Sequence, residues 1–219
     1  MKKAVSWAAI CALAVGLAFV VPGTMATAAT AGPASQASYA TFPGRLYSVD
    51  AVSASNVWAV GLEPSNSLIV HWNGSTWSQS LVGAGYFQGV SASSADNVWA
   101  VGGTNWFVPT QPLAEHWNGS SWSQVPVPNP AAGGLLNSVA TTSATNAWAV
   151  GSTGPGPGGG SALDPLIEHW SGKRWTIQGF QGSLPGGSFA GVAATSASNA
   201  WAVGSTGANS QGTGQRTLI

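Results

Sequence analysis

A short pattern of apolar and polar residues occurs four times along the chain. Each copy begins with a Ser-Ala-x-Asn turn and continues into an apolar run that is centred on tryptophan and ends in glycine. A near-continuous apolar run of this length predicts a β-strand that is buried on both faces. The four copies are Ser53–Gly61, Ser94–Gly102, Ser143–Gly151 and Ser196–Gly204, with the tryptophans Trp58, Trp99, Trp148 and Trp201.

A second pattern follows each of the first three copies. It contains the sequence His-Trp-Asn-Gly or His-Trp-Ser-Gly and then a further tryptophan. Asn-Gly favours a two-residue type I′ hairpin turn, because both central residues need a positive φ. The second pattern therefore predicts two more strands joined by a hairpin. Its histidines are His71, His116 and His169, each followed by Trp72, Trp117 or Trp170, and the further tryptophans are Trp77, Trp122 and Trp175.

One more strand ahead of each turn gives every unit four short antiparallel strands in about 40 to 50 residues, which matches a propeller blade. The sequence thus predicts an all-β fold, a β-propeller of four-stranded antiparallel blades with about 3.5 blades present. Frequent glycine and proline exclude a helical solenoid, and a β-sandwich would not need the same tryptophans in every unit. The predicted blades cover about residues 45–82, 83–130, 131–182 and 183–219, the last one incomplete.

These motifs resemble the repeat of secreted propeller-like proteins that are common in actinobacteria and similar in style to kelch and Asp-box propellers. The resemblance covers Tyr47–Ile219 and rests on V-W-A-V-G, H-W-N-G and the tryptophan that follows. It implies a propeller fold and an exported location, and it implies no particular activity. The chain departs from kelch repeats in lacking their double glycine, and it matches the Asp-box only loosely.

The fourth unit ends at Ile219, just before the Glu-His-Trp that an alignment with Pro165–Ile167 would place next. Because closed propellers have about four or more blades, we expect the chain to be a truncated piece of a propeller with about six to eight. The alternative is a small closed ring in which residues 38–43 supply an outer closing strand to the fourth unit.

The N-terminus has the features of a secretory signal peptide. Lys2 and Lys3 precede the apolar stretch Ala4–Val21, and small residues follow with A-x-A cleavage patterns that end at Ala28 and Ala31. This order predicts a signal peptide over residues 1–28, a linker over 29–44, a secreted protein, and no membrane span after cleavage. Cys11 lies in the apolar stretch, so the mature chain would contain no disulfide and no thiolate metal site.

The charge content is unusually low for a folded protein. Only 5% of the residues are charged and the formal net charge is zero, while 44% are hydrophobic and 12 are tryptophan. The chain can therefore bury a core, and its polar surface must come from uncharged side chains. Nucleic-acid binding needs a basic surface to neutralise phosphates, which excludes nucleic acid as a partner.

The antiparallel strand order predicts where ligands would bind. Turns after the first and third strands of each unit leave from one rim and are short and constant. Turns after the second and fourth strands leave from the other rim and vary, as binding loops do. Aromatic rings stack on sugars while amides bond to their hydroxyls, although Trp106 and Phe107 could instead cap the core. The candidate ligand-binding residues on this rim are Asn105, Trp106, Phe107, Gln111 and Tyr86.

Other residues that could carry chemistry are better explained as scaffold. One histidine recurs beside a tryptophan in each unit, which favours a structural role over a metal site. Glu115 and Glu168 also occupy a repeated position, and the first unit has Val70 there. No nucleophile elbow, zinc-protease or phosphate-loop motif occurs. We therefore expect no catalytic residue, no metal and no cofactor.

Three functions remain open from the sequence. The first is a non-enzymatic extracellular scaffold whose variable loops bind a glycan, such as a cell-wall polysaccharide, or a protein. The second is a fragment of a larger propeller hydrolase or lyase whose catalytic residues are not in this chain. The third is a structural spacer or protein-interaction module.

Overall fold

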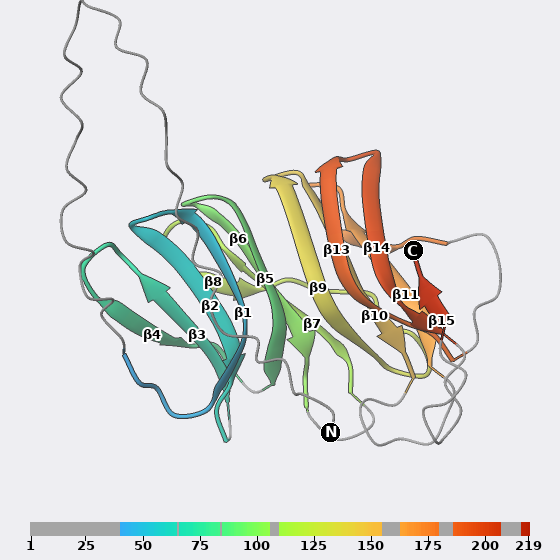
Figure 1. Cartoon of the computed structure of the whole chain (residues 1–219), viewed down its shortest axis with the longest axis horizontal. Helices are drawn as coiled ribbons and strands as arrows, with labels where there is room; N and C mark the ends of the chain where they lie inside the picture. Colours follow the sequence, from blue (N-terminus) through green and yellow to red (C-terminus); the bar gives the residue numbers. More distant parts are fainter. Residues whose placement is uncertain are drawn as a thin grey trace, which may run out of the picture. The chain divides into compact units, whose positions relative to one another are not determined.

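The computed structural model describes residues 40–64, 66–83, 85–105, 110–154, 163–179, 186–206 and 216–219. Within these ranges the chain forms four antiparallel sheets in sequence order, three with four strands and one with three (Figure 1). None of the described residues forms a helix that is long and apolar enough to span a bilayer. The predicted signal peptide and most of the predicted linker lie outside the described residues.

Each sheet is built from strands that are consecutive in the sequence. The first sheet contains β1 (Arg45–Ser53), β2 (Asn56–Leu62), β3 (Ser67–Trp72) and β4 (Trp77–Leu81), and the second contains β5 (Tyr86–Ser94), β6 (Asn97–Gly103), β7 (Pro112–Trp117) and β8 (Trp122–Gln124). The third contains β9 (Gly134–Ser143), β10 (Asn146–Thr153), β11 (Asp164–Trp170) and β12 (Trp175–Ile177), and the fourth contains β13 (Ser188–Ser196), β14 (Asn199–Thr206) and β15 (Arg216–Leu218).

The sheets follow one another so that their first strands lie together. β1 contacts β5, β5 contacts β9, and β9 contacts β13, whereas the fourth strands contact mainly the third strands of their own sheets. Sheets that converge at the first strand and spread at the fourth are the blades of a propeller. The predicted all-β propeller with about 3.5 blades is therefore confirmed.

Tryptophans fill the space between successive sheets. Trp58 of β2 is 2% exposed, and its ring lies 5.1 Å from Trp117 and 5.3 Å from Trp122 of the second sheet. Trp99 of β6 is fully buried and lies 5.0 Å from both Trp170 and Trp175 of the third sheet. The first and second sheets thus each insert one tryptophan between two tryptophans of the next sheet.

The glycine that ends each V-W-A-V-G pattern has a steric cause. A Cβ at Gly61 would overlap the Arg45 carbonyl oxygen, and one at Gly102 would overlap that of Tyr86. These carbonyls belong to the first strand of the same sheet, close to a shift in the strand register. A side chain at this position would force the first two strands apart.

The hairpin after the third strand differs from the predicted two-residue turn. β3 ends at Trp72 and β4 begins at Trp77, so the connection has four residues rather than two. The side-chain oxygen of Asn73 accepts hydrogen bonds from the amides of Ser75 and Thr76, at 3.0 and 2.9 Å. Gly74 has a φ of 94°. The turn closed by the Asn73 side chain forms in place of the predicted type I′ turn, because its oxygen accepts hydrogen bonds from two backbone amides at once.

The fourth sheet is less complete and less buried than the other three. β15 pairs only with Gly204–Thr206, and β14 is half exposed, whereas its counterpart β6 is buried throughout. Of the suggested closing strand at residues 38–43, residues 38 and 39 lie outside the described part. Residues 40–43 form no strand, and Phe42 packs against Ala59, Leu68 and Val70 of the first sheet.

The central tryptophan contact can be tested by truncation. Trp99→Ala is expected to lower the free energy of unfolding by about 3–5 kcal/mol, because a fully buried indole leaves a cavity between two sheets. The matched control is Ile177→Ala, whose side chain is 48% exposed; its expected cost is below about 1 kcal/mol. Urea denaturation followed by circular dichroism measures both, and equal costs would contradict the role given to Trp99.

Candidate functional site

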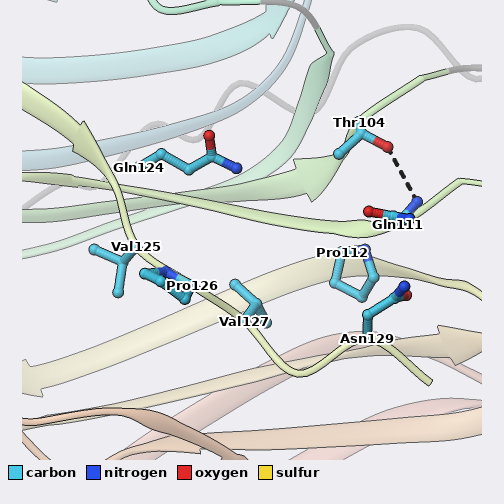
Figure 2. A pocket seen from close by; sticks show the side chains of 8 residues that line it. All are labelled: Thr104, Gln111, Pro112, Gln124, Val125, Pro126, Val127 and Asn129. Carbon is cyan, nitrogen blue, oxygen red and sulfur yellow. Dashed lines mark hydrogen bonds between the residues drawn. The ribbon is translucent and has the colours of Figure 1, made fainter.

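A recess of about 340 Å³ opens on the rim that carries the variable loops. One wall comes from the connection between β6 and β7, and the other comes from β8 and the segment after it (Figure 2). Its volume lies at the lower end of the range for small-ligand sites, about 300–1,000 Å³. The residues that line it are Thr104, Gln111, Pro112, Gln124, Val125, Pro126, Val127 and Asn129.

The first wall is held by hydrogen bonds across the base of the loop. The amide of Thr104 donates to the Gln111 carbonyl oxygen at 2.9 Å. In return the Gln111 amide donates to the Thr104 hydroxyl oxygen at 3.1 Å (Figure 2). These two bonds fix the backbone at both ends of the loop, and the side chain of Gln111 remains exposed.

The second wall is an extended segment stiffened by alternating prolines. β8 ends at Gln124, and the amide of the next residue, Val125, still donates a hydrogen bond to the Ala114 carbonyl oxygen at 3.0 Å. Pro126 fixes its own φ and pushes the residue before it toward an extended conformation. Val125 and Val127 pack against the core between the second and third sheets. Exposed Gln124, Pro126 and Asn129 therefore stand on a rigid support.

The lining chemistry suits an uncharged polar ligand. Three amide side chains and one hydroxyl lie among proline and valine side chains, and none of the described lining residues is charged. Amides can donate and accept hydrogen bonds without the desolvation penalty of a charge. The arrangement can bind hydroxyl groups or peptide groups, and it supplies no acid, base or nucleophile.

A second recess of about 240 Å³ lies between the third and fourth sheets. It is bordered by Trp148, Val150, Ile167 and Trp201 together with several alanines. Among its lining residues only Ser198 has a polar side chain apart from the two indoles, so the recess offers little to orient a polar ligand. The second and third sheets each have a pair of tryptophans on their third and fourth strands, Trp117 with Trp122 and Trp170 with Trp175. The described part of the fourth sheet has no such pair, and the recess lies where it would be. We therefore treat the loop recess as the candidate site.

The sequence-predicted site residues have different positions in the structure. Gln111 lines the recess, and exposed Asn105 adjoins Thr104 in its wall. Trp106 and Phe107 lie outside the described residues. The prediction that Tyr86 binds a ligand is wrong. Tyr86 begins β5 and is only 2% exposed, with its hydroxyl beside Gly103. A buried ring in this position is part of the core and cannot stack on a ligand.

Sequence reasoning missed the second wall of the recess. Gln124, Pro126, Val127 and Asn129 were assigned only to the end of a strand and a variable loop. The signal that could have found them is the alternation of Pro126, Pro128 and Pro130, which predicts a stiff extended segment rather than a flexible loop.

The repeated histidines lie on the third strands of their sheets, where each bonds to an asparagine and lies against a tryptophan ring, stacked for His71 and His169 and tilted for His116. Nε2 of His71 is 3.0 Å from the side-chain oxygen of Asn56, and its ring centroid is 3.9 Å from that of Trp58. His116 and His169 make the same bond to Asn97 and Asn146, each at 2.7 Å. Burial lowers the pKa of all three histidines, because desolvation disfavours the charged ring.

The repeated glutamates are buried. Glu168 is fully buried, and neither of its carboxyl oxygens has a hydrogen-bond partner among the described residues. Burial raises the pKa of Glu168 from 4.5 to about 8, and that of Glu115 to about 7. Within the described part of the chain, no group of three or more His, Cys, Asp or Glu residues could hold a metal ion.

Comparison with known proteins adds little beyond the fold. No protein-family model matches the chain, and no curated protein matches it. A solved structure described as "YCF48 bound to D1 peptide" is similar, with 19% sequence identity and a TM-score of 0.44. The match covers 64% of this chain and 43% of that chain, so this chain spans less than half of its length. The fold assignment therefore depends on the sheet geometry described above.

The buried carboxyl of Glu168 should make stability depend on pH. Its folded pKa of about 8 exceeds the ordinary 4.5, so the unfolded chain ionises first as pH rises. Stability should therefore fall between about pH 4.5 and 8 and level off above that. Glu168→Gln should reduce this slope, leaving the smaller contribution of Glu115, and should raise the unfolding free energy at pH 7 by about 3 kcal/mol.

Denaturation at pH 5, 7 and 9 would measure this effect. Asp164→Asn on the same strand is the control, because Asp164 is exposed, and its expected change is within about 0.5 kcal/mol. An unchanged pH slope in Glu168→Gln would show that Glu168 is ionised in the folded protein.

Proposed function

We propose that this chain is a secreted, non-enzymatic binding propeller whose loop recess binds a neutral glycan, such as a cell-wall polysaccharide. The observation that carries the proposal is the uncharged recess, in which Gln111, Gln124 and Asn129 lie among proline and valine side chains. Sugar hydroxyls need partners that both donate and accept hydrogen bonds, and their apolar C–H faces need an apolar support.

The rigidity of the recess supports this proposal. The loop wall is closed by two hydrogen bonds, and the opposite wall is stiffened by prolines and anchored by two valines in the core. A preformed site loses little conformational entropy when a ligand binds, so weak hydrogen bonds to hydroxyls can still give measurable affinity.

Export is part of the same proposal. The positive N-terminus, the apolar stretch and the A-x-A patterns support it, together with the absence of cysteine from residues 29–219. A low charge content also leaves a surface of uncharged polar groups, which suits contact with polysaccharide rather than with nucleic acid.

A glycan array on the purified chain would test binding. Binding to one class of neutral polysaccharide is expected, and Gln124→Ala and Gln111→Ala should each weaken it about 10-fold, the effect of losing about 1.4 kcal/mol of hydrogen bonding. Gln79→Ala is the matched control, because Gln79 occupies the equivalent position in the first sheet, where it bonds to Glu63.

Three results would count against the proposal. The first is no binding to any glycan. The second is equal weakening by Gln79→Ala, which would place the contact elsewhere. The third is binding to an uncharged peptide alone, which would make the recess a protein-interaction site.

The export step has its own test. Mass spectrometry of protein collected from the medium of producing cells is expected to show an N-terminus at Ala29 or Gly32, following cleavage after Ala28 or Ala31. Retention of residues 1–28 on protein that stays with the membrane would contradict release and indicate an anchor.

A further inference from the structure

The hairpin turns that join the third and fourth strands of the first two sheets share one sequence pattern and one structure. Each consists of Asn-Gly-Ser and one further hydroxyl residue, and all four residues of each turn are exposed. A backbone hydrogen bond closes both turns, from the amide of Asn73 to the Thr76 carbonyl oxygen at 3.2 Å and from the amide of Asn118 to the Ser121 carbonyl oxygen at 3.3 Å. The fold thus presents the same asparagine to solvent twice, on the rim opposite the loop recess.

The hydrogen-bond donors of the first turn converge on the side-chain oxygen of Asn73. This Oδ1 accepts hydrogen bonds from the amide and the hydroxyl of Ser75, at 3.0 and 2.9 Å, and from the amide of Thr76 at 2.9 Å. The hydroxyl of Thr76 adds a longer bond at 3.4 Å. Several donors fixed at this distance polarise a carbonyl group and stabilise negative charge that develops on its oxygen, as in an oxyanion hole. The turn therefore makes Cγ of Asn73 more electrophilic.

The next residue along the chain supplies a nitrogen beside that carbon. Because Oδ1 reaches the amides two and three residues ahead, the Asn73 side chain folds over the peptide that joins it to Gly74. Gly74 has no side chain to block the approach, its φ is 94°, and none of the described residues accepts a hydrogen bond from its amide. Holding two reacting groups together in this way lowers the entropic cost of their reaction. The geometry favours ring closure between the Gly74 nitrogen and Cγ of Asn73.

The turn of the second sheet repeats these contacts. Oδ1 of Asn118 accepts hydrogen bonds from the amide and the hydroxyl of Ser120, at 3.0 and 2.8 Å, and from the amide of Ser121 at 3.0 Å. Gly119 follows with a φ of 93°, and no residue in the described ranges accepts a hydrogen bond from its amide. The arrangement therefore belongs to the repeat rather than to one loop.

We propose that the folded turns make Asn73 and Asn118 sites of self-catalysed deamidation. The amide nitrogen of Gly74 loses its proton to water and attacks Cγ of Asn73, and negative charge moves onto Oδ1. The new N–Cγ bond closes a five-membered succinimide ring, the Cγ–Nδ2 bond breaks, and Nδ2 leaves as ammonia after taking a proton from water. Water then opens the ring at either carbonyl, which leaves aspartate or isoaspartate. The net reaction consumes one water and releases one ammonia, without an oxidant or a cofactor.

The modification changes the charge of this rim and leaves the loop recess unchanged. The formal net charge of the chain is zero, so each event adds one negative charge to a protein with few charges. An aspartate carboxylate can accept the same amide hydrogen bonds as Oδ1 does. Isoaspartate adds one backbone atom to the turn, which loosens the pairing of Trp72 with Trp77.

Other asparagines of the chain lack this combination of features. Asn97 and Asn146 are buried and bonded to histidines. Asn129 is exposed, but proline follows it and has no amide hydrogen to lose. Asn129 therefore serves as an internal control for the reaction.

Peptide mapping by mass spectrometry of the purified full chain, incubated at neutral pH, tests this proposal. Conversion of amide to acid at Asn73 and Asn118 should be at least about 10-fold faster than in the same chain unfolded in guanidinium chloride, which corresponds to about 1.4 kcal/mol of barrier. Isoaspartate should accompany aspartate, because direct hydrolysis of the side-chain amide gives aspartate alone. Asn129 should remain unchanged over the same time.

Two variants separate the effect of the turn from that of the Asn-Gly sequence. Ser75→Ala removes one donor to Oδ1 and should slow the reaction at Asn73 about 5-fold or more, while Asn118 in the same molecule keeps its rate. Ser171→Asn places asparagine in the equivalent turn of the third sheet and should create a third site. The amide of Ser171 already closes that turn by donating to the Arg174 carbonyl oxygen at 3.3 Å, and Gly172 has a φ of 84°.

Circular dichroism checks that both variants are folded. Four results would each overturn the proposal: an equal or slower rate in the folded chain than in the unfolded one, products that contain no isoaspartate, a rate at Asn73 that Ser75→Ala leaves unchanged or lowers no more than the rate at Asn118, and a folded Ser171→Asn variant that stays intact at that position.

Discussion

The insertion of one tryptophan between two others is the contact on which the rest of the structure depends. Each sheet has an apolar face that must be covered, and Trp58 and Trp99 fill the space that twisted sheets leave between them. Their indole nitrogens have no hydrogen-bond partner among the described residues, so the contact is one of shape and aromatic packing. The tryptophan in each His-Trp sequence has a second task, because Nε1 of Trp117 donates to the Ala95 carbonyl oxygen at 3.1 Å and ties the third strand to the first turn.

The buried polar groups divide into satisfied and unsatisfied sets. Each repeated histidine has an asparagine partner and a tryptophan ring against its own, which makes it a fixed part of its sheet. Glu168 is buried and has no hydrogen-bond partner among the described residues, so it remains in the folded protein as a neutral acid up to about pH 8. The equivalent position in the first sheet holds Val70, which is 1% exposed, so the site accepts an apolar side chain.

The loop recess differs in character from the rest of the fold. It is polar, uncharged and held by hydrogen bonds and prolines, which suits weak binding to many hydroxyl groups. The spaces between the sheets are apolar and filled by tryptophans, which suits packing rather than ligand binding.

The sequence by itself determined the repeat, the strand order and the tryptophans of the core, because apolar periodicity and turn residues act over a few neighbouring positions. It also placed the variable loops on one rim, since antiparallel order fixes which ends meet. Only the tertiary structure decided that Tyr86 is buried and that Gln124 and Asn129 face Gln111 across a recess. Those outcomes depend on contacts between segments that are distant in the sequence, such as Tyr86 with Gly103 and Val125 with Ala114, and local patterns carry no information about which distant surfaces will meet.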